Sequence, residues 1–252
     1  MKKIIVDILL FILILVEFSR LYLPPEIHEI IGIVLMVLVI IHLILNRKYI
    51  KSIPKGKYNL KRSSMLIINV AFMAAFALTS VLGLLSNQYT LTFMNIGNLS
   101  TIYLHKIFAY LCLILLGLHL GINLNALFNR LGEKKISYAL YVIIIICGIY
   151  SFFKVDFLNH LLGNSGFGLA TGNLFTNSLE YLSIVLMITI LANLILKKTV
   201  GWLINCQWFL SKGGEEPSTR DSNNIFNSVH HPFNSCYYVF VIYNVFVVVI
   251  VE

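Results

Sequence analysis

The sequence predicts an all-α integral membrane protein, folded as a bundle of about six transmembrane helices. Of its 252 residues, 58% are hydrophobic and only 12% are charged, whereas soluble domains contain about 25% charged residues. The mean hydropathy is +0.85. The apolar residues gather in long runs that short basic or polar segments separate. A chain embedded in a lipid bilayer explains these observations together.

Six apolar segments reach or approach the roughly 20 residues that a helix needs to cross the hydrocarbon core. They are residues 4–23, 26–46, 64–86, 101–128, 136–153 and 178–196. The first resembles the start of a signal peptide, but it lacks a small-residue cleavage site and carries Glu17 and Arg20 at its far end. We therefore expect a retained anchor. Pro24 and Pro25 break the chain before the second helix.

The basic residues predict the orientation of the helices. They cluster after the second, fourth and sixth segments: Arg47, Lys48, Lys51, Lys55, Lys57, Lys61, Arg62; Arg130, Lys134, Lys135; Lys197 and Lys198. The loops 87–100 and 154–177 contain a single lysine, Lys154. By the positive-inside rule, the N-terminus and the basic loops are cytoplasmic, so segments 26–46 and 101–128 both run from outside to inside. The net charge of +8 then reflects membrane orientation and not nucleic-acid binding.

Two of the predicted helices carry the same histidine frame. Residues 28–42 read HEIIGIVLMVLVIIH and residues 105–119 read HKIFAYLCLILLGLH. Fourteen helical residues rise about 21 Å and turn about 40° short of four full turns. Each helix therefore places its two histidines on one face, near opposite edges of the membrane. Because the two helices are parallel, we expect His28 at the depth of His105, and His42 at the depth of His119.

An ionisable residue inside a membrane span is by default a candidate functional residue. A single histidine is more often a packing residue, but a doubled frame argues against coincidence. Zinc usually takes four ligands, or three and a water, whereas each depth offers only two histidines. In addition, His28-Glu29 does not continue as the zinc-binding motif H-E-x-x-H. Both observations argue against a zinc site. Two opposed imidazoles suit an iron porphyrin. The frame predicts two molecules of haem b, with His28, His105, His42 and His119 as iron ligands. The sequence contains no C-x-x-C-H motif, so we expect the haems to be bound without a covalent link.

The doubled frame resembles the two-haem core of membrane b-type cytochromes, and more closely the flavinylation-associated cytochrome family, formerly a domain of unknown function. The resemblance covers roughly residues 1–150. It rests on the stretches HEIIGIVLMVLVIIHLILNRKYI and LHKIFAYLCLILLGLHLGINLNAL and on the turn SVLGLLS at residues 80–86. Its specific positions are His28, Glu29, Gly32, His42, Asn46, His105 and His119. The resemblance implies a cytochrome b-like haem-binding core and electron transfer across the membrane, often beside flavin-carrying partners outside the cell.

The predicted function is therefore transmembrane electron transfer by a multi-pass protein of the cell membrane. Candidate donors are a membrane quinol or an inner-side reductase, and the candidate acceptor is an extracytoplasmic flavoprotein. No catalytic acid, base or nucleophile stands out, which favours an electron-carrier subunit of an oxidoreductase complex over a self-contained enzyme. Two alternatives stay open: a transporter whose histidines relay protons, and a structural membrane anchor subunit without haem.

The remaining segments carry less specific signals. Residues 1–198 are expected to form the transmembrane bundle, and residues 199–252 a cytoplasmic or membrane-associated tail with no assigned role. The glycine-rich loop 154–177 lacks the order of a phosphate-binding motif, so we expect a connector there. Gly32, Gly117 and Gly121 fit either close approach of a porphyrin or contact between helices. His160, His230 and His231 are expected to be solvated.

Overall fold

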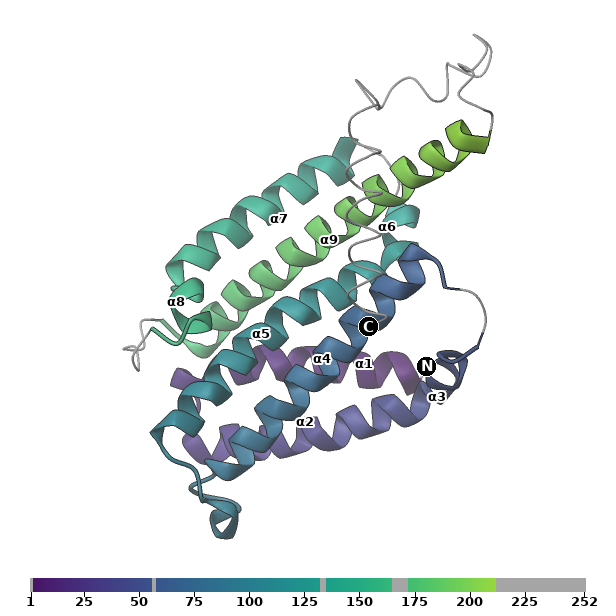
Figure 1. Cartoon of the computed structure of the whole chain (residues 1–252). Coiled ribbons are helices and arrows are strands. Elements are labelled where there is room, and N and C mark those ends of the chain that lie inside the picture. Colours follow the sequence, from purple (N-terminus) through teal and green to yellow (C-terminus); the bar gives the residue numbers. More distant parts are fainter. Residues whose placement is uncertain (1, 56–57, 132–134, 165–171, 212–252) are drawn as a thin grey trace. The chain divides into compact units, whose positions relative to one another are not determined.

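The computed structural model describes residues 2–55, 58–131, 135–164 and 172–211 (Figure 1). Every regular element in these ranges is a helix, which confirms the all-α prediction. The α-helices are α1 (Lys2–Phe18), α2 (Pro25–Leu45), α3 (Arg47–Ser52), α4 (Leu60–Leu85), α5 (Leu99–Asn123), α6 (Asn125–Leu131), α7 (Lys135–Lys154), α8 (Phe157–Leu161) and α9 (Leu174–Ser211). Two short 3-10 helices, η1 (Arg20–Tyr22) and η2 (Thr92–Met94), lie in the connections.

Five of these helices are long and apolar enough to cross a membrane: α2, α4, α5, α7 and α9. They correspond to five of the six predicted spans. The first predicted span, 4–23, is shorter than expected, because α1 ends at Phe18 and η1 follows. Its 17 residues extend about 26 Å, somewhat less than the roughly 30 Å of a hydrocarbon core. A sixth span through α1 therefore stays a prediction.

Two other predicted boundaries are wrong. The fourth span was expected to continue to residue 128, but α5 ends at Asn123 and α6 starts as a separate helix at Asn125. The loop 154–177 was expected to be a plain connector, but it contains α8. The side chain of Phe157 in α8 is only 1% exposed and belongs to the main hydrophobic core. An aromatic side chain anchors this segment because burying it is worth about 1.5–3 kcal/mol.

Polar caps fix where the helices after the loops begin. Asn59 precedes α4 and its side chain accepts a hydrogen bond from the Arg62 backbone amide. Asn98 and Thr101 form a capping box at the start of α5. In each case a side chain satisfies backbone amides that have no partner within the helix. These caps set the register of α4 and α5, the two helices that position half of the candidate site.

Helices α1, α2, α4 and α5 form a closed ring. α1 packs on α2, α2 on α4, and α4 on α5. The ring closes between α5 and α1, where Phe18 meets Tyr110 with ring centroids 5.4 Å apart and Leu15 joins the same core cluster. In such a ring α2 and α5 are diagonal partners. The two histidine-bearing helices therefore face each other across the interior of a four-helix arrangement.

Helix α9 packs on the outside of this ring, against α5, and α7 packs on α9 (Figure 1). Small residues permit the close approach: a Cβ on Gly117 or Gly121 of α5 would lie 2.7 Å from a side-chain atom of α9. Gly148 of α7 meets Met187 of α9 in the same way, at 2.5 Å. Contact through small residues is the usual way in which transmembrane helices associate.

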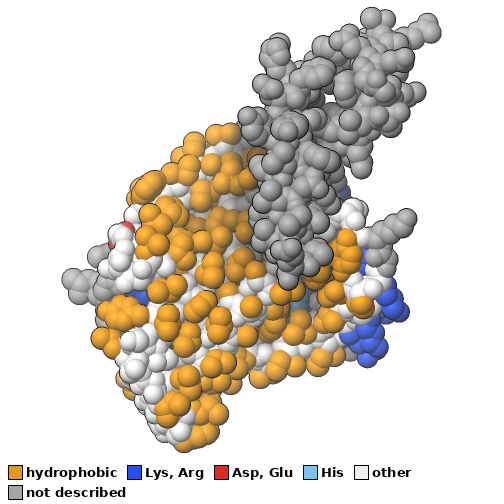
Figure 2. All heavy atoms as spheres, in the orientation of Figure 1, with side chains coloured by type: hydrophobic (Ala, Val, Ile, Leu, Met, Phe, Trp, Pro, Cys, Tyr) orange, Lys and Arg blue, Asp and Glu red, His pale blue; other side chains and the backbone are white. Residues whose placement is uncertain are grey.

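The surface fits a lipid environment. Figure 2 shows hydrophobic side chains over most of the visible face, with Lys and Arg gathered at the end where α3 lies. Exposed isoleucines and valines follow one another along α2, as at Ile30, Val34, Val37 and Ile41. By packing, the chain divides into two units, residues 1–196 and 197–252. The second contains the end of α9, and its residues from 212 onward lie outside the described ranges, as do the predicted solvated residues His230 and His231.

Candidate functional site

The α2 histidines are each paired with a carboxylate of α1. His42 Nδ1 lies 2.7 Å from Asp7 Oδ1, in a hydrogen bond. His28 Nδ1 lies 2.8 Å from Glu17 Oε2. Asp7 lies near the start of α1 and Glu17 near its end, and nothing in the sequence alone links either acid to a particular histidine. The antiparallel packing of α1 on α2 brings each acid to the depth of one histidine.

The α5 histidines are held by neutral groups of α4. His105 Nδ1 donates to the backbone carbonyl of Thr79 at 2.8 Å. His119 Nδ1 donates to the side-chain oxygen of Asn69 at 2.8 Å. The amide nitrogen of Asn69 in turn donates to the Tyr49 hydroxyl at 3.0 Å, which ties α4 to α3. Both rings are thus oriented by the helix that packs most closely on α5.

The histidines lie together in pairs, one from each helix. The rings of His28 and His105 have centroids 6.3 Å apart and planes at 89°. His42 is close enough to His119 to act on it electrostatically, as is Asp7. The expected grouping by depth is therefore found in the structure for His28 with His105, and His42 lies at the level of His119.

A shared pattern governs the ring nitrogens. His42, His105 and His119 each form a hydrogen bond from Nδ1 to an oxygen acceptor on the neighbouring helix. In these three rings, Nε2 is then the nitrogen with the lone pair. Histidines that bind metals show this arrangement almost always, because the acceptor fixes the tautomer and makes the ligating nitrogen more basic. At His42 the Asn46 amide lies 3.3 Å from Nε2, so a metal at that nitrogen would require Asn46 to turn away from it.

The Glu17 site contains polar atoms that the described protein groups do not satisfy. Although His28 Nδ1 and Glu17 Oε2 are 2.8 Å apart, they are not aligned for a hydrogen bond. His28 Nδ1 and Glu17 Oε1 are both buried and without a hydrogen-bond partner among the described residues. A buried carboxylate oxygen without a hydrogen-bond partner lowers the stability of the fold. A cation bound at Nε2 of His28 would make the imidazole more positive. That positive charge would offset the negative charge of the Glu17 carboxylate.

Two asparagines extend the repeated frame beyond the histidines. Asn46 and Asn123 each follow an inner histidine by four residues. The Asn46 amide donates to the His42 carbonyl at 2.9 Å, and the Asn123 amide donates to the His119 carbonyl at 2.7 Å. Both terminate a histidine-bearing helix in the same way. Asn46 belongs to the family resemblance, whereas the match at Asn123 was visible in the sequence and was missed.

Glu29 fastens α2 to the connection between α4 and α5. Its carboxylate accepts backbone N–H groups from Gln88, Tyr89 and Thr90, at distances from 2.7 to 3.3 Å, and the Thr90 hydroxyl at 3.1 Å. Three successive amides form an anion cradle, and here a carboxylate of the same chain occupies it. Glu29 therefore fixes the outer end of α2 next to His28, which is a structural role.

The glycines of the resemblance have different environments. A Cβ on Gly83, in the SVLGLLS turn, would lie 3.0 Å from His105 Cε1 and 3.2 Å from His105 Nδ1. Gly83 therefore makes room for the His105 ring. A Cβ on Gly32 would meet no atom within 4 Å, so the space beside it is open. Gly117 and Gly121 pack against α9, which excludes them from the face that a porphyrin would approach.

The pairs fit a cofactor that needs two protein ligands. Within the described ranges, no three or more His, Cys, Asp or Glu side chains gather where they could hold a metal ion. A porphyrin supplies four nitrogens itself and needs only the two axial ligands. With metal–nitrogen bonds of about 2.0–2.1 Å and ring centres about 1.1 Å behind the nitrogens, two axial imidazoles have centroids roughly 6 Å apart. The 6.3 Å between His28 and His105 fits this requirement.

His160 is not the solvated residue that the sequence suggested. Its ring stacks on Tyr110 with centroids 5.0 Å apart and planes at 18°. Partial burial lowers the pKa of His160, as does the nearby Lys106 ammonium, while Asp156 opposes them. His160 belongs to α8, on the side of α5 that faces α1 and α9, because Tyr110 also contacts Phe18 and Tyr181. It is a packing residue and lies apart from the four paired histidines.

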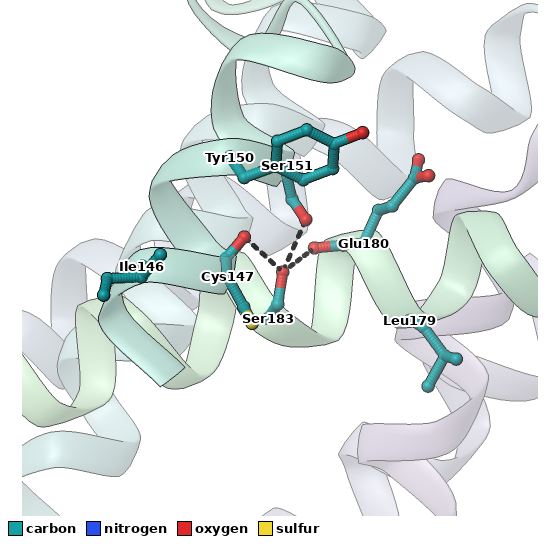
Figure 3. Close-up of a pocket in the computed structure, with 7 residues that line it drawn as sticks. All are labelled: Ile146, Cys147, Tyr150, Ser151, Leu179, Glu180 and Ser183. Carbon is teal, nitrogen blue, oxygen red and sulfur yellow. Dashed lines mark hydrogen bonds between the residues drawn. The ribbon is translucent and has the colours of Figure 1, made fainter. Parts of the chain in front are cut away.

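A groove lies between α7 and α9, and no histidine is among the residues that line it (Figure 3). In Figure 3 the Ser183 hydroxyl points toward Ser151 and toward the backbone oxygens of Cys147 and Glu180. These bonds satisfy the serine within the protein. The ionisable groups of its lining are the Cys147 thiol, the Tyr150 hydroxyl and the Glu180 carboxylate, and Glu180 pairs with the Lys154 ammonium.

Comparison of the chain with protein-family models, curated proteins and solved structures finds no match. The functional argument therefore depends on the arrangement of the four histidines and of the groups that hold them.

Proposed function

We propose that this protein is a two-haem b-type cytochrome that carries electrons across a membrane. His28 with His105 would hold the outer haem, and His42 with His119 the inner one. The observation that carries the proposal is the common setting of the four rings: they are paired by depth across the bundle, and each Nδ1 lies 2.7–2.8 Å from an oxygen of the neighbouring helix. When bound, each haem supplies reversible one-electron chemistry at its iron.

The chain's own residues contribute ligation, orientation and spacing. Asp7, Thr79 and Asn69 fix three of the rings by hydrogen bonds, and Glu29 fixes the outer end of α2. The two histidines of one helix are separated by about 21 Å of helical rise, so they belong to different cofactors. The apolar side chains between them keep water and competing ligands out of the bilayer interior.

The partners follow from this role as part of the proposal. A quinol within the bilayer or a cytoplasmic reductase would donate electrons, and an extracytoplasmic flavoprotein would accept them. The resemblance of residues 1–150 to the flavinylation-associated cytochromes supports the flavoprotein. The chain would then be an electron-carrier subunit in the cell membrane and not a complete oxidoreductase.

One observation favours a different function. His42 with Asp7, and His28 with Glu17, are histidine–carboxylate pairs of the kind that relay protons in membrane transporters. A transporter needs no chromophore. In contrast, the neutral acceptors of His105 and His119 orient a ring without offering a proton site, which supports the cytochrome.

The test is haem content followed by electron transfer. The full chain is expressed in a haem-sufficient host, purified in detergent, and assayed by pyridine haemochrome for non-covalent haem. We expect two haems per chain, and in liposomes an internal reductant should reduce an external, membrane-impermeant ferric acceptor. A folded but colourless protein that carries protons would contradict the cytochrome and support the transporter.

A further inference from the structure

The two histidine-bearing helices differ in the charge of the groups that hold their rings. On α2, both histidines face carboxylates, Asp7 and Glu17 of α1. On α5, both face neutral oxygens, those of Thr79 and Asn69 of α4. Each depth therefore combines one histidine backed by a carboxylate with one backed by a neutral acceptor.

The positions of these acceptors repeat like those of the histidines. The carboxylates stand ten residues apart on α1, at 7 and 17, and the neutral acceptors stand ten residues apart on α4, at 69 and 79. The histidines stand fourteen apart on both partner helices. Two helix pairs, α1 with α2 and α4 with α5, thus share the same spacing of histidines and of the groups beside them. What differs between them is the charge.

Ordinary surface solvation does not account for both carboxylates. The Glu17 side chain is 14% exposed, and its free oxygen is buried. Asp7 is 51% exposed, yet its carboxylate lies 2.7 Å from the His42 ring. In the described ranges, the ion pairs recorded for these two acids are those with the histidines. Lys3, the nearby cation, instead donates to Asn46 at 3.2 Å.

We propose that Asp7 and Glu17 are positioning residues that lower the redox potentials of the two sites, Asp7 at the inner site and Glu17 at the outer site. The inference rests on the proposed function. A carboxylate at Nδ1 increases the electron donation of the imidazole to a metal at Nε2 and stabilises the more positive, oxidised iron. Helix α1 then has an electronic role in addition to any role as an anchor.

The test is a redox titration of purified variants, followed by visible absorption at each potential. Asp7→Asn keeps an oxygen acceptor at His42 and removes the charge, and Glu17→Gln removes the charge that lies 2.8 Å from His28 Nδ1. Loss of a group that orients a ligand typically changes metal affinity 10- to 100-fold. We expect a shift of that size in the one-electron equilibrium of one site, about 60–120 mV upward, with the other site unchanged.

A reciprocal variant separates electronic tuning from damage to the fold. Asn69→Asp places a carboxylate at His119 and should lower the potential of the inner site, and Asp7→Asn combined with Asn69→Asp should return it close to the wild-type value. Glu26→Gln is the matched control, because it removes an exposed carboxylate near the outer end of α2 that faces no histidine. If Asp7→Asn does not fold, Asn69→Asp alone carries the test.

The outcomes are distinct. Upward shifts confined to the inner site in Asp7→Asn and to the outer site in Glu17→Gln support the inference. If wild type holds two haems but both substitutions leave both potentials unchanged, or move the two sites equally, the inference is wrong while the cytochrome stands. A wild-type protein without haem overturns the proposed function and this inference together.

Discussion

Replacing Gly83 with alanine should weaken the outer site selectively. The added Cβ would lie 3.0 Å from His105 Cε1 and 3.2 Å from Nδ1, whereas unstrained contacts between such atoms are about 3.5–4.0 Å. The ring would have to move roughly 0.5 Å away from α4. That movement stretches the bond from Nδ1 to the Thr79 carbonyl from 2.8 Å to about 3.3 Å, beyond the usual range.

The magnitude follows from the loss of one hydrogen bond. Such a bond contributes about 0.5–1.5 kcal/mol, which corresponds to a roughly 2- to 12-fold weaker affinity. We expect Gly83→Ala to bind the outer haem with an affinity lowered by that factor and to retain the inner haem. The assay is titration of haem into the haem-depleted protein, with the two sites resolved by their spectra or potentials.

A second glycine supplies the control. Gly148→Ala places a Cβ 2.5 Å from Met187 Cβ, so it disturbs the packing of α7 on α9 without touching a histidine. It should lower thermal stability and leave the ratio of outer to inner affinity unchanged. The reasoning about Gly83 would be refuted if Gly83→Ala left that ratio unchanged, or if Gly148→Ala altered it equally.

Two further predictions concern orientation and pH. Reporter fusions at residue 58 should be cytoplasmic and those at residue 95 extracytoplasmic, because the basic residues gather near the former; the opposite pattern would exchange the outer and inner labels of the two sites. His160 has a lowered pKa in the folded protein, so the unfolded chain takes up a proton first as the pH falls. The fold should therefore lose stability on acidification below about 6.5. His160→Phe should reduce this loss in thermal unfolding measured between pH 7.5 and 5; an unchanged pH dependence would contradict the assignment.

The sequence was sufficient for five of the six predicted spans and for the pairing of His28 with His105. Both are consequences of helical periodicity and of apolar length, which neighbouring segments do not alter. The frame from His28 to His42 repeats from His105 to His119, and a parallel pair of helices can only match these residues in one way. The structure brings His28 next to His105 accordingly.

The groups that hold the rings were not predictable in the same way. The sequence does not show which groups Asp7 and Glu17 contact, because their partners depend on how α1 rotates against α2. Thr79 contributes a backbone carbonyl, which no residue type reveals. Asn69 lies 50 residues from His119 in the chain. The ten-residue spacing shared by 7 with 17 and 69 with 79 acquires meaning only when the helix pairs are known.

Composition alone misjudged one loop and could not decide the role of two glycines. The polar, glycine-rich segment 154–177 suggested a connector, yet Phe157 is buried and His160 stacks on Tyr110. Gly117 and Gly121 flank His119 in the sequence, which left open whether they face a porphyrin or another helix. On a helix, however, residues two positions away point to a different face, and both glycines contact α9.

The most direct test of the central claim is which histidine replacements remove the same haem. We expect His28→Ala and His105→Ala each to abolish the outer haem signal and keep the inner one, and His42→Ala and His119→Ala to do the reverse. The double variant of His28 and His105 should match either single variant, since the two act as one unit, and His160→Ala should keep both haems. If His28→Ala and His105→Ala removed different haems, or left both in place, the two-haem account would be contradicted.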